Sequence, residues 1–218
     1  MPAKAVAKRR REDKNPAPQK SARLSAAAKH ATKPGSAHKP CIVGIGASAG
    51  GFEAIRAFLK SMPAESDIAF VIVQHLDPTH TSLAAELFAK FTTMPVSEAR
   101  NGTLLLANHV YTAPSNKELA VTGGRLRLTP RNQTKKPHLP IDYFFNSLGK
   151  DCAARAIGIV LSGTGTDGAL GLKTIAANGG VVLAQEPSTA QFDGMPRSAI
   201  ATGLVNYVLP VERMPKML

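Results

Sequence analysis

The chain has 218 residues, which is long enough for one α/β domain with a hydrophobic core of its own. Its formal net charge of +12 is uneven, because residues 1–40 carry 11 Lys or Arg against two acidic residues, while the rest carries +3. Two cysteines are too few for a disulfide-rich protein, and no apolar stretch approaches the roughly 20 residues of a membrane-spanning helix.

Residues 1–40 are rich in Lys, Ala, Pro and Ser, and their sizeable apolar side chains are Val6 and Leu24. Such a segment buries too little apolar surface to offset its ordering entropy, so we predict a disordered basic tail. No apolar stretch of a signal peptide follows the positive residues. The cluster 8–11 suits an anionic membrane, nucleic acid or an acidic protein surface, but a solvated linker is the simpler interpretation, and no nucleic-acid partner is expected.

From Cys41 onward, apolar runs alternate with segments of helical spacing. The apolar runs predict buried strands over 41–48, 68–75, 156–163, 181–185 and 205–210. The segments between them predict helices over 50–62, 79–91, 140–152, 167–180 and 195–203. The predicted core faces are Phe52, Ile55, Phe58 and Leu59 in the first helix and Leu83, Leu87 and Phe91 in the second. This alternation predicts an α/β fold, a doubly wound and mostly parallel sheet with helices on both faces.

The middle of the chain has a different pattern. HVYTAP (109–114), KELAVT (117–122) and RLRLTP (125–130) are short segments, and Gly123-Gly124 joins the last two. They predict a small antiparallel hairpin excursion from the main sheet.

The cysteines and histidines do not predict a metal site. Cys41 and Cys152 each lie beside an apolar run, so buried, reduced thiols of a cytoplasmic protein are expected. His80, His109 and His138 have no ligand partner at useful spacing, which favours solvated or capping roles. No metal and no cofactor is predicted.

A glycine-rich segment follows the first predicted strand. Residues 46–50 read G-A-S-A-G and fit the nucleophile elbow G-x-S-x-G, in which small neighbours allow a sharp turn that presents Ser48 at the carboxyl edge of the sheet. The next helix directs its N–H groups and the positive end of its dipole to the same place, which suits an oxyanion.

The same segment also fits the dinucleotide-binding pattern G-x-G-x-x-G/A, with Ala49 in the last position. That interpretation requires an acidic residue at the end of the second strand to bind the ribose. The strand ends instead in Gln74-His75, so a nucleotide-binding module is the weaker alternative.

Two further polar residues follow predicted strands. His75 ends the second strand, and Asp167 follows the strand at 156–163 and precedes a helix. Taken alone, the histidine could pack under a loop and the aspartate could cap its own helix. Open α/β sheets, however, place their sites at the carboxyl ends of strands, and a serine nucleophile needs a base and a carboxylate. Together with Ser48 they predict a Ser-His-Asp site.

Five segments in order resemble the catalytic domain of CheB, the chemoreceptor methylesterase: IVGIGASAGG, VIVQHLDPTH, NHVYTAPSNKEL, GIVLSGTGTDGALGLKTI and QFDGMPRSAIATGLVNYVLP. The resemblance spans residues 41–213. It is strongest to versions that precede a CheR methyltransferase in fusion proteins, so residues 214–218 are expected to begin a following segment or to be a truncated end.

The resemblance implies a cytoplasmic enzyme that hydrolyses glutamate methyl esters on the cytoplasmic helices of chemoreceptors and in many members also deamidates glutamines. It places the family's catalytic residues on Ser48, His75 and Asp167. For this reaction we expect the N–H groups near Ala49 and Thr164 to hold the oxyanion. Gly163 and Gly165 are expected to let the backbone approach the site closely, or simply to form a turn. Many CheB proteins have Thr and Met where this chain has Ala49 and Thr164, so any contribution of a threonine hydroxyl at position 49 is absent.

Two alternatives remain open beside the esterase. One is a non-catalytic module with the same fold that docks to a receptor or kinase, and the other is the nucleotide-binding module. Arg197 has two interpretations, either a contact with an acidic receptor segment or a surface ion pair.

Overall fold

The computed structural model describes Met1 and residues 39–75, 83–131 and 137–218. The chain divides after residue 37, and the unit His38–Leu218 contains all the helices and strands given below.

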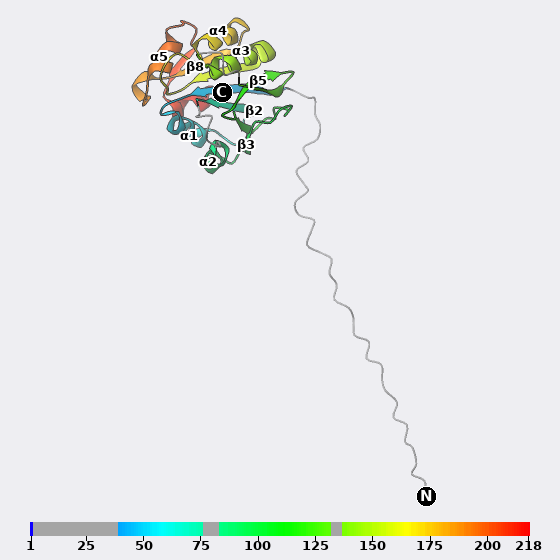
Figure 1. The fold of residues 1–218 in the computed structure, drawn as a ribbon. Helices are drawn as coiled ribbons and strands as arrows, with labels where there is room; N and C mark the ends of the chain where they lie inside the picture. Colours follow the sequence, from blue (N-terminus) through cyan, green and yellow to red (C-terminus); the bar gives the residue numbers. More distant parts are fainter. Residues whose placement is uncertain (2–38, 76–82, 132–136) are drawn as a thin grey trace. The chain divides into compact units, whose positions relative to one another are not determined.

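The centre of this unit is a seven-stranded sheet with the strand order β3-β4-β2-β1-β7-β8-β9 (Figure 1). All neighbouring strands in it pair in parallel. Its strands are β1 (Cys41–Ala47), β2 (Ile68–Gln74), β3 (Val96–Glu98), β4 (His109–Thr112), β7 (Ala156–Val160), β8 (Val181–Gln185) and β9 (Tyr207–Leu209). A separate antiparallel hairpin is formed by β5 (Lys117–Thr122) and β6 (Arg125–Pro130).

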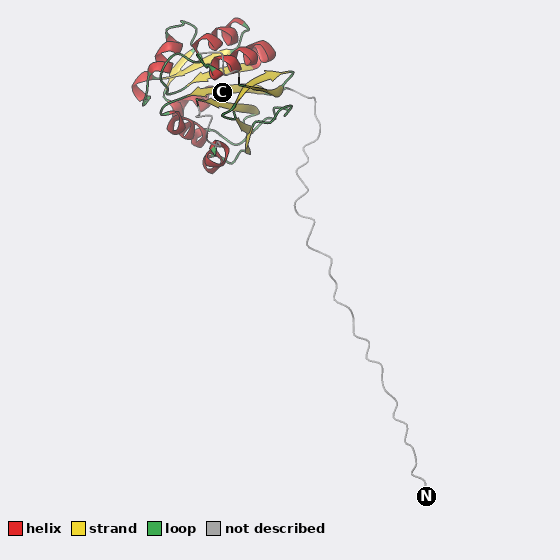
Figure 2. Cartoon of the chain, in the orientation of Figure 1, coloured by secondary structure: helices red, strands yellow, loops and turns green. Residues whose placement is uncertain are grey.

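Helices cover both faces of the sheet, as Figure 2 shows. One face packs against α3 (Pro140–Cys152), α4 (Ala169–Ala177), α5 (Gly194–Ile200) and the hairpin. The other packs against α1 (Gly51–Ser61), α2 (Ala84–Phe88) and the 3₁₀ segment η4 (Val211–Met217). Three shorter 3₁₀ segments are η1 (Ala89–Phe91), η2 (Ala153–Arg155) and η3 (Pro187–Thr189).

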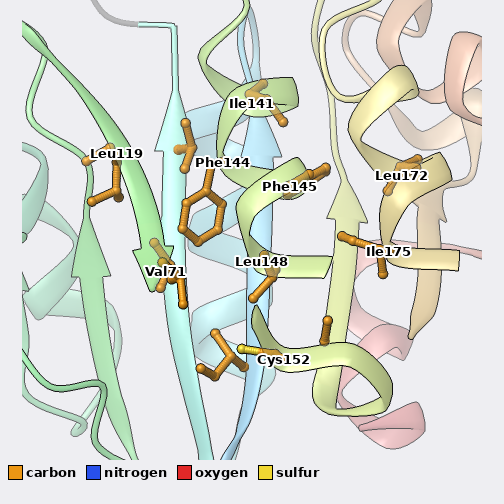
Figure 3. Packing of buried hydrophobic residues seen from close by; sticks show 14 of the residues in the cluster. Val71, Leu119, Ile141, Phe144, Phe145, Leu148, Cys152, Leu172 and Ile175 are labelled. Carbon is orange, nitrogen blue, oxygen red and sulfur yellow. The ribbon is translucent and has the colours of Figure 1, made fainter. Parts of the chain in front are cut away.

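The central strand β1 shows why α3 lies so close to the sheet. Val43 and Ile45 point to the α1 face, whereas Gly44 and Gly46 point to the α3 face. A Cβ on Gly44 would lie 2.9 Å from each of three side chains of α3, and a Cβ on Gly46 would overlap Ile141. Figure 3 shows the core side chains of α3 between the sheet and α4; those labelled on this helix are Ile141, Phe144, Phe145, Leu148 and Cys152. The absence of side chains at Gly44 and Gly46 therefore lets α3 pack closely against β1.

The predicted fold class is confirmed: the protein is α/β, with a parallel sheet and a small antiparallel hairpin. The predicted bounds of β5, β6, α3 and β8 agree with the structure. The prediction for 109–114 was wrong in its partner, because β4 joins the main sheet in parallel with β2. The edge strand β3 was not predicted, since three residues carry almost no period.

The second predicted helix also differs. Residues 79–82 lie outside the described residues, and α2 begins at Ala84. Leu83 and Leu87 are 56% and 38% exposed, whereas Phe88 is buried and stacks on Phe52 with 5.3 Å between ring centroids. The predicted apolar face was thus wrong at Leu83 and Leu87, because α2 turns the ring of Phe88 toward α1. Phe91 is half-buried and packs against the same core, as predicted. The face predicted for α1 is confirmed, with Phe52 half-buried and the other three residues buried.

Both cysteines are free thiols. Cys152 is buried, and burial followed by the nearby Asp151 raises the pKa of its thiol to about 11. Cys41 is half-buried, so burial was predicted correctly for one of the two. Within the described ranges, no helix is long and apolar enough to cross a membrane, and no three His, Cys, Asp or Glu side chains group as a metal site would require.

Candidate functional site

The carboxyl ends of β1 and β2 bring Ser48 beside His75. The two strands pair in register up to Ala47 and Gln74, and the next residue on each strand is the predicted nucleophile or base. The N–H of His75 still donates to the carbonyl of Ala47 at 3.3 Å. Neighbouring strands lie about 4.8 Å apart, so parallel pairing alone places the two residues side by side.

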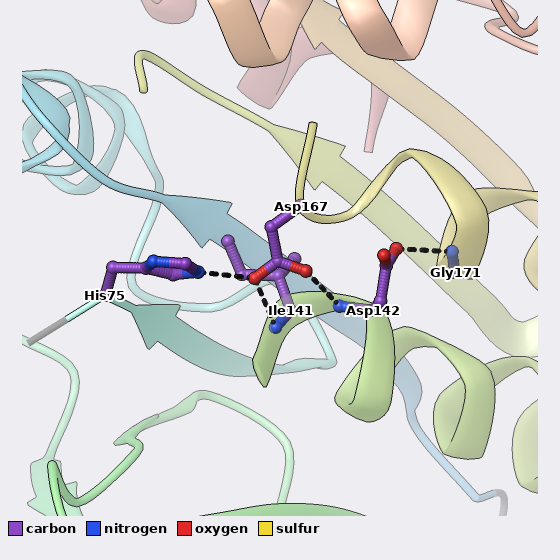
Figure 4. Close-up of polar contacts among 5 residues, drawn as sticks. All are labelled: His75, Ile141, Asp142, Asp167 and Gly171. Carbon is purple, nitrogen blue, oxygen red and sulfur yellow. Dashed lines mark hydrogen bonds and ion pairs between the residues drawn. The ribbon is translucent and has the colours of Figure 1, made fainter. Parts of the chain in front are cut away.

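The segment after β7 brings Asp167 to the same edge. Nε2 of His75 donates to Oδ2 of Asp167 at 2.6 Å, as Figure 4 shows. The aspartate is 3% exposed and the histidine side chain is 35% exposed, so the base reaches solvent while its partner does not. A neutral imidazole carries one N–H, and this bond places that proton on Nε2 and leaves Nδ1 basic.

The carboxylate of Asp167 is held by the start of α3. The N–H of Ile141 donates to Oδ2 at 3.0 Å, and the N–H of Asp142 donates to Oδ1 at 2.9 Å (Figure 4). The simpler alternative of a cap on its own helix does not apply, since among the described residues Asp167 makes no hydrogen bond to α4, whose N-cap is Gly168. Asp167 instead caps α3, where free N–H groups and the helix dipole favour a negative charge.

Ser48 lies in a sharp turn. Its N–H donates to the carbonyl of Ser162 at 3.0 Å, and its carbonyl accepts from Gly51 at 2.9 Å. Gly50 has φ of 69°, and a Cβ there would lie 2.7 Å from Oγ of Ser162, so this position requires glycine. Among the described residues, the hydroxyl of Ser48 makes no hydrogen bond with His75. The His–Asp pair is formed, and the serine is adjacent to it through the backbone.

The four predicted site-lining residues differ in what their N–H groups do. Within the described part of the chain, the N–H groups of Ala49 and Thr164 have no hydrogen-bond acceptor. The N–H of Gly163 donates to Phe192 at 2.9 Å, so it is occupied. A Cβ on Gly163 would overlap Sδ of the buried Met195 and would lie 3.0 Å from Cβ of Ser48, which explains the glycine. Gly165 has φ of 81°, in the left-handed region, and a Cβ there would meet no atom within 4 Å.

Two buried polar residues behind the serine were not predicted. Ser162 donates from Oγ to the carbonyl of Ala49 at 2.9 Å and accepts from the N–H of Phe192 at 3.0 Å. Gln185 accepts from the N–H of Ser162 at 2.9 Å. Both lie at carboxyl ends of buried strands, and a polar residue in that position was the available signal.

His138 lies beside the candidate base. Its ring centroid is 6.4 Å from that of His75, and both side chains line a cavity of about 170 Å³. Burial, followed by the charge of Arg131, lowers the pKa of His138. The side chain of His138 is half-buried in the wall of this cavity, so it is partly solvated, as predicted.

The remaining candidates have structural roles or lie outside the description. Nδ1 of His109 donates to the carbonyl of Ala107 at 2.9 Å, which is a capping contact. Arg197 donates to Asp193 at 2.6 Å across one turn of α5, and both side chains are largely exposed. This is the surface ion pair of the two interpretations. His80 lies outside the described residues.

Comparison with known proteins gives one consistent result. The CheB methylesterase family matches residues 43–218. A protein-glutamate methylesterase/protein-glutamine glutaminase 2 of Burkholderia lata is 39% identical over 181 residues, covering 83% of this chain and 53% of that protein. A Myxococcus xanthus protein-glutamate methylesterase/protein-glutamine glutaminase 1 is 37% identical over 176 residues, covering 79% and 51%.

A solved structure agrees. The Thermotoga maritima CheB methylesterase catalytic domain superposes with a TM-score of 0.75 at 28% identity, covering 82% of this chain and 96% of that domain. The chain spans about half the length of the relatives above and nearly all of the solved domain. With matching segments, matching fold and the polar edge of β1, β2 and β7 in place, the chain belongs to the CheB methylesterase family.

Proposed function

We propose that this chain is a protein-glutamate methylesterase that hydrolyses γ-methyl esters of glutamate on chemoreceptors, and that it deamidates glutamines at the same site. The observation that carries the proposal is the His75–Asp167 pair, held by α3 and adjacent to Ser48 in an elbow turn. Family membership supports the choice of ester.

The proposed reaction is a two-step acyl transfer. Nδ1 of His75 takes the proton of Ser48 as Oγ attacks the ester carbonyl, and the imidazolium then protonates the departing methoxide, which leaves as methanol. Water, deprotonated by the same nitrogen, cleaves the acyl-enzyme to glutamate and free serine. Asp167 keeps the proton on Nε2 and stabilises the imidazolium, and α3 prevents the carboxylate from turning away.

The N–H groups of Ala49 and Thr164 are the proposed oxyanion donors. Both are backbone groups, so neither depends on the side chain at its position. Their lack of an acceptor among the described residues supports this role, whereas the N–H of Gly163 already donates to Phe192 and is not proposed as a donor. The methyl side chain of Ala49 has no hydroxyl to contribute, so stabilisation here rests on main-chain groups.

The decisive test measures methanol release from γ-methyl-glutamyl peptides by the whole chain. Wild type is expected to release methanol, and Ser48→Ala is expected to lose at least about a thousandfold in kcat, because the nucleophile is removed. The matched control is Ser61→Ala at the exposed end of α1, which should retain full activity. Equal release by Ser48→Ala and wild type would refute the proposal.

A non-catalytic docking module is the second candidate, and the absence of a Ser48–His75 hydrogen bond in the described residues favours it. Catalytic hydrogen bonds are often long before substrate binds, and the esterase mechanism requires only that this one forms in the substrate complex. A fluorophosphonate probe separates the two: labelling of Ser48 that depends on His75 supports the enzyme, and no labelling supports the docking module.

The cellular setting completes the proposal. Residues 41–213 are the catalytic domain, the basic segment 1–40 precedes it, and the protein works in the cytoplasm. The similarity of the five motifs to those of CheB–CheR fusion proteins supports a CheR-type methyltransferase in the same polypeptide. The mass of the endogenous protein, detected with an antibody to this chain, tests that arrangement.

A further inference from the structure

A cavity of about 170 Å³ lies on the side of His75 formed by β2, β4 and the hairpin. Its walls come from the ends of β2 and β4, the start of β5, the segment after β6 and the start of α3. The residues that matter here are His75, Lys117, Arg131 and His138. One side chain, His75, is therefore shared between this cavity and the proposed reaction site.

The cavity is lined by cations and by no carboxylate among the described residues. In the same part of the chain, neither Lys117 nor Arg131 has an ion-pair partner. Two acidic groups act on His138 from nearby: Glu118, which is next to Lys117 on β5, and Asp167. Glu118 pairs with neither cation among the described residues, and Asp167 is already bonded to His75 and to the start of α3.

We propose that this cavity is a subsite for a substrate carboxylate, so that the enzyme prefers a methyl-glutamyl residue with an acidic side chain close to it. The inference rests on the proposed function and specifies its substrate. Lys117 and Arg131 supply the charge-assisted hydrogen bonds, and His138 closes the wall between them and His75. A free anion would gain the same bonds, but a carboxylate tethered to the ester is held at high local concentration.

The test compares peptides that each contain one γ-methyl-glutamyl residue. At each of the three positions on either side, one series has Glu and a matched series has Gln. Binding is measured by fluorescence anisotropy with Ser48→Ala protein, and kcat/KM for methanol release is measured with the native serine. At one or more positions Glu is expected to bind about fivefold more tightly than Gln, since the charges are partly exposed.

Variants identify the groups responsible. In Arg131→Gln and in Lys117→Gln, the ratio of Glu to Gln affinities is expected to fall toward one. The matched control is Lys216→Gln, which removes the same charge from η4 on the α1 side of the sheet and should leave the ratio unchanged. Circular dichroism confirms that each variant is folded.

The outcomes separate the two proposals. If wild type releases no methanol while Ser48→Ala protein still prefers Glu peptides, the esterase fails and the carboxylate subsite stands. If methanol is released but no position shows a preference for Glu, the subsite is refuted and the esterase stands. A preference that persists in both cavity variants, or that Lys216→Gln also removes, refutes the subsite as well.

Discussion

Asp167 and Asp142 each accept hydrogen bonds from the N-terminus of a neighbouring helix: Asp167 from α3 and Asp142 from α4. Asp167 precedes α4 but accepts the first N–H groups of α3, while Asp142 lies in the first turn of α3 and accepts from Gly171 of α4 at 2.7 Å. Each buried carboxylate therefore satisfies donors at the start of the other helix. This exchange fixes the orientation of the carboxylate that binds His75.

The exchange predicts opposite results for two substitutions. Asp142→Ala removes the acceptor of the Gly171 N–H, so we expect the free energy of unfolding to fall by about 1 kcal/mol. Near pH 4, where the carboxyl binds a proton, Asp142→Asn keeps an oxygen in the same place and should stay within about 0.5 kcal/mol of wild type. Urea denaturation of both variants measures the difference, and equal losses would contradict the capping role.

The pH dependence follows from the same residue. Burial raises the pKa of Asp142 above its ordinary value of 3.8, so the folded state binds this proton more tightly than the unfolded state does. A raised carboxyl pKa lowers stability as the pH rises through it. Wild type should therefore lose stability relative to Asp142→Asn between about pH 4 and about pH 7, and denaturation at both limits tests this.

At the scale of elements, contact between β1 and α3 sets the site. Gly46 lies in the strand directly below Ile141, whose N–H donates to Asp167. Helix packing thus explains Gly44 and Gly46, the two glycines that fit the dinucleotide-binding pattern. The same contact carries the start of α3 to the carboxyl edge of β1, where the carboxylate is needed.

Enlarging Gly46 should therefore affect stability and catalysis together. We expect Gly46→Ala to lower the free energy of unfolding by about 1–3 kcal/mol, because its methyl group overlaps Ile141. It should also lower kcat, because the displaced helix start no longer holds Asp167. A double-mutant cycle with Ile141→Ala measures the coupling, and losses that simply add would exclude a shared steric cause.

At the scale of the whole molecule, the charge and the site belong to different segments. The residues proposed to act on substrate all lie in His38–Leu218, while most of the net charge lies in residues 1–40. The junction is nevertheless tied to the domain, since Arg155 donates to the carbonyl of Pro40 at 2.7 Å. A deletion should therefore stop before Lys39.

Removal of residues 1–38 takes away ten Lys or Arg and two acidic residues. We expect unchanged unfolding free energy and unchanged kcat on a peptide without flanking acids, because the described core begins at β1. Thermal denaturation and the methanol assay measure both quantities. A loss of more than about 1 kcal/mol or of most activity would show that the segment supports the domain.

The sequence by itself determined the α/β class, the bounds of β5, β6, α3 and β8, and the three polar residues at strand ends. These follow from local pattern: apolar period sets strands and helices, and parallel strands bring their carboxyl ends together. Tertiary packing decided the rest. The partner of β4, the exposed Leu83, the cap from Asp167 to α3 and the cavity at His138 all depend on contacts between residues distant in the chain. No local pattern encodes such contacts, because each depends on how strands and helices that are distant in the sequence pack against one another.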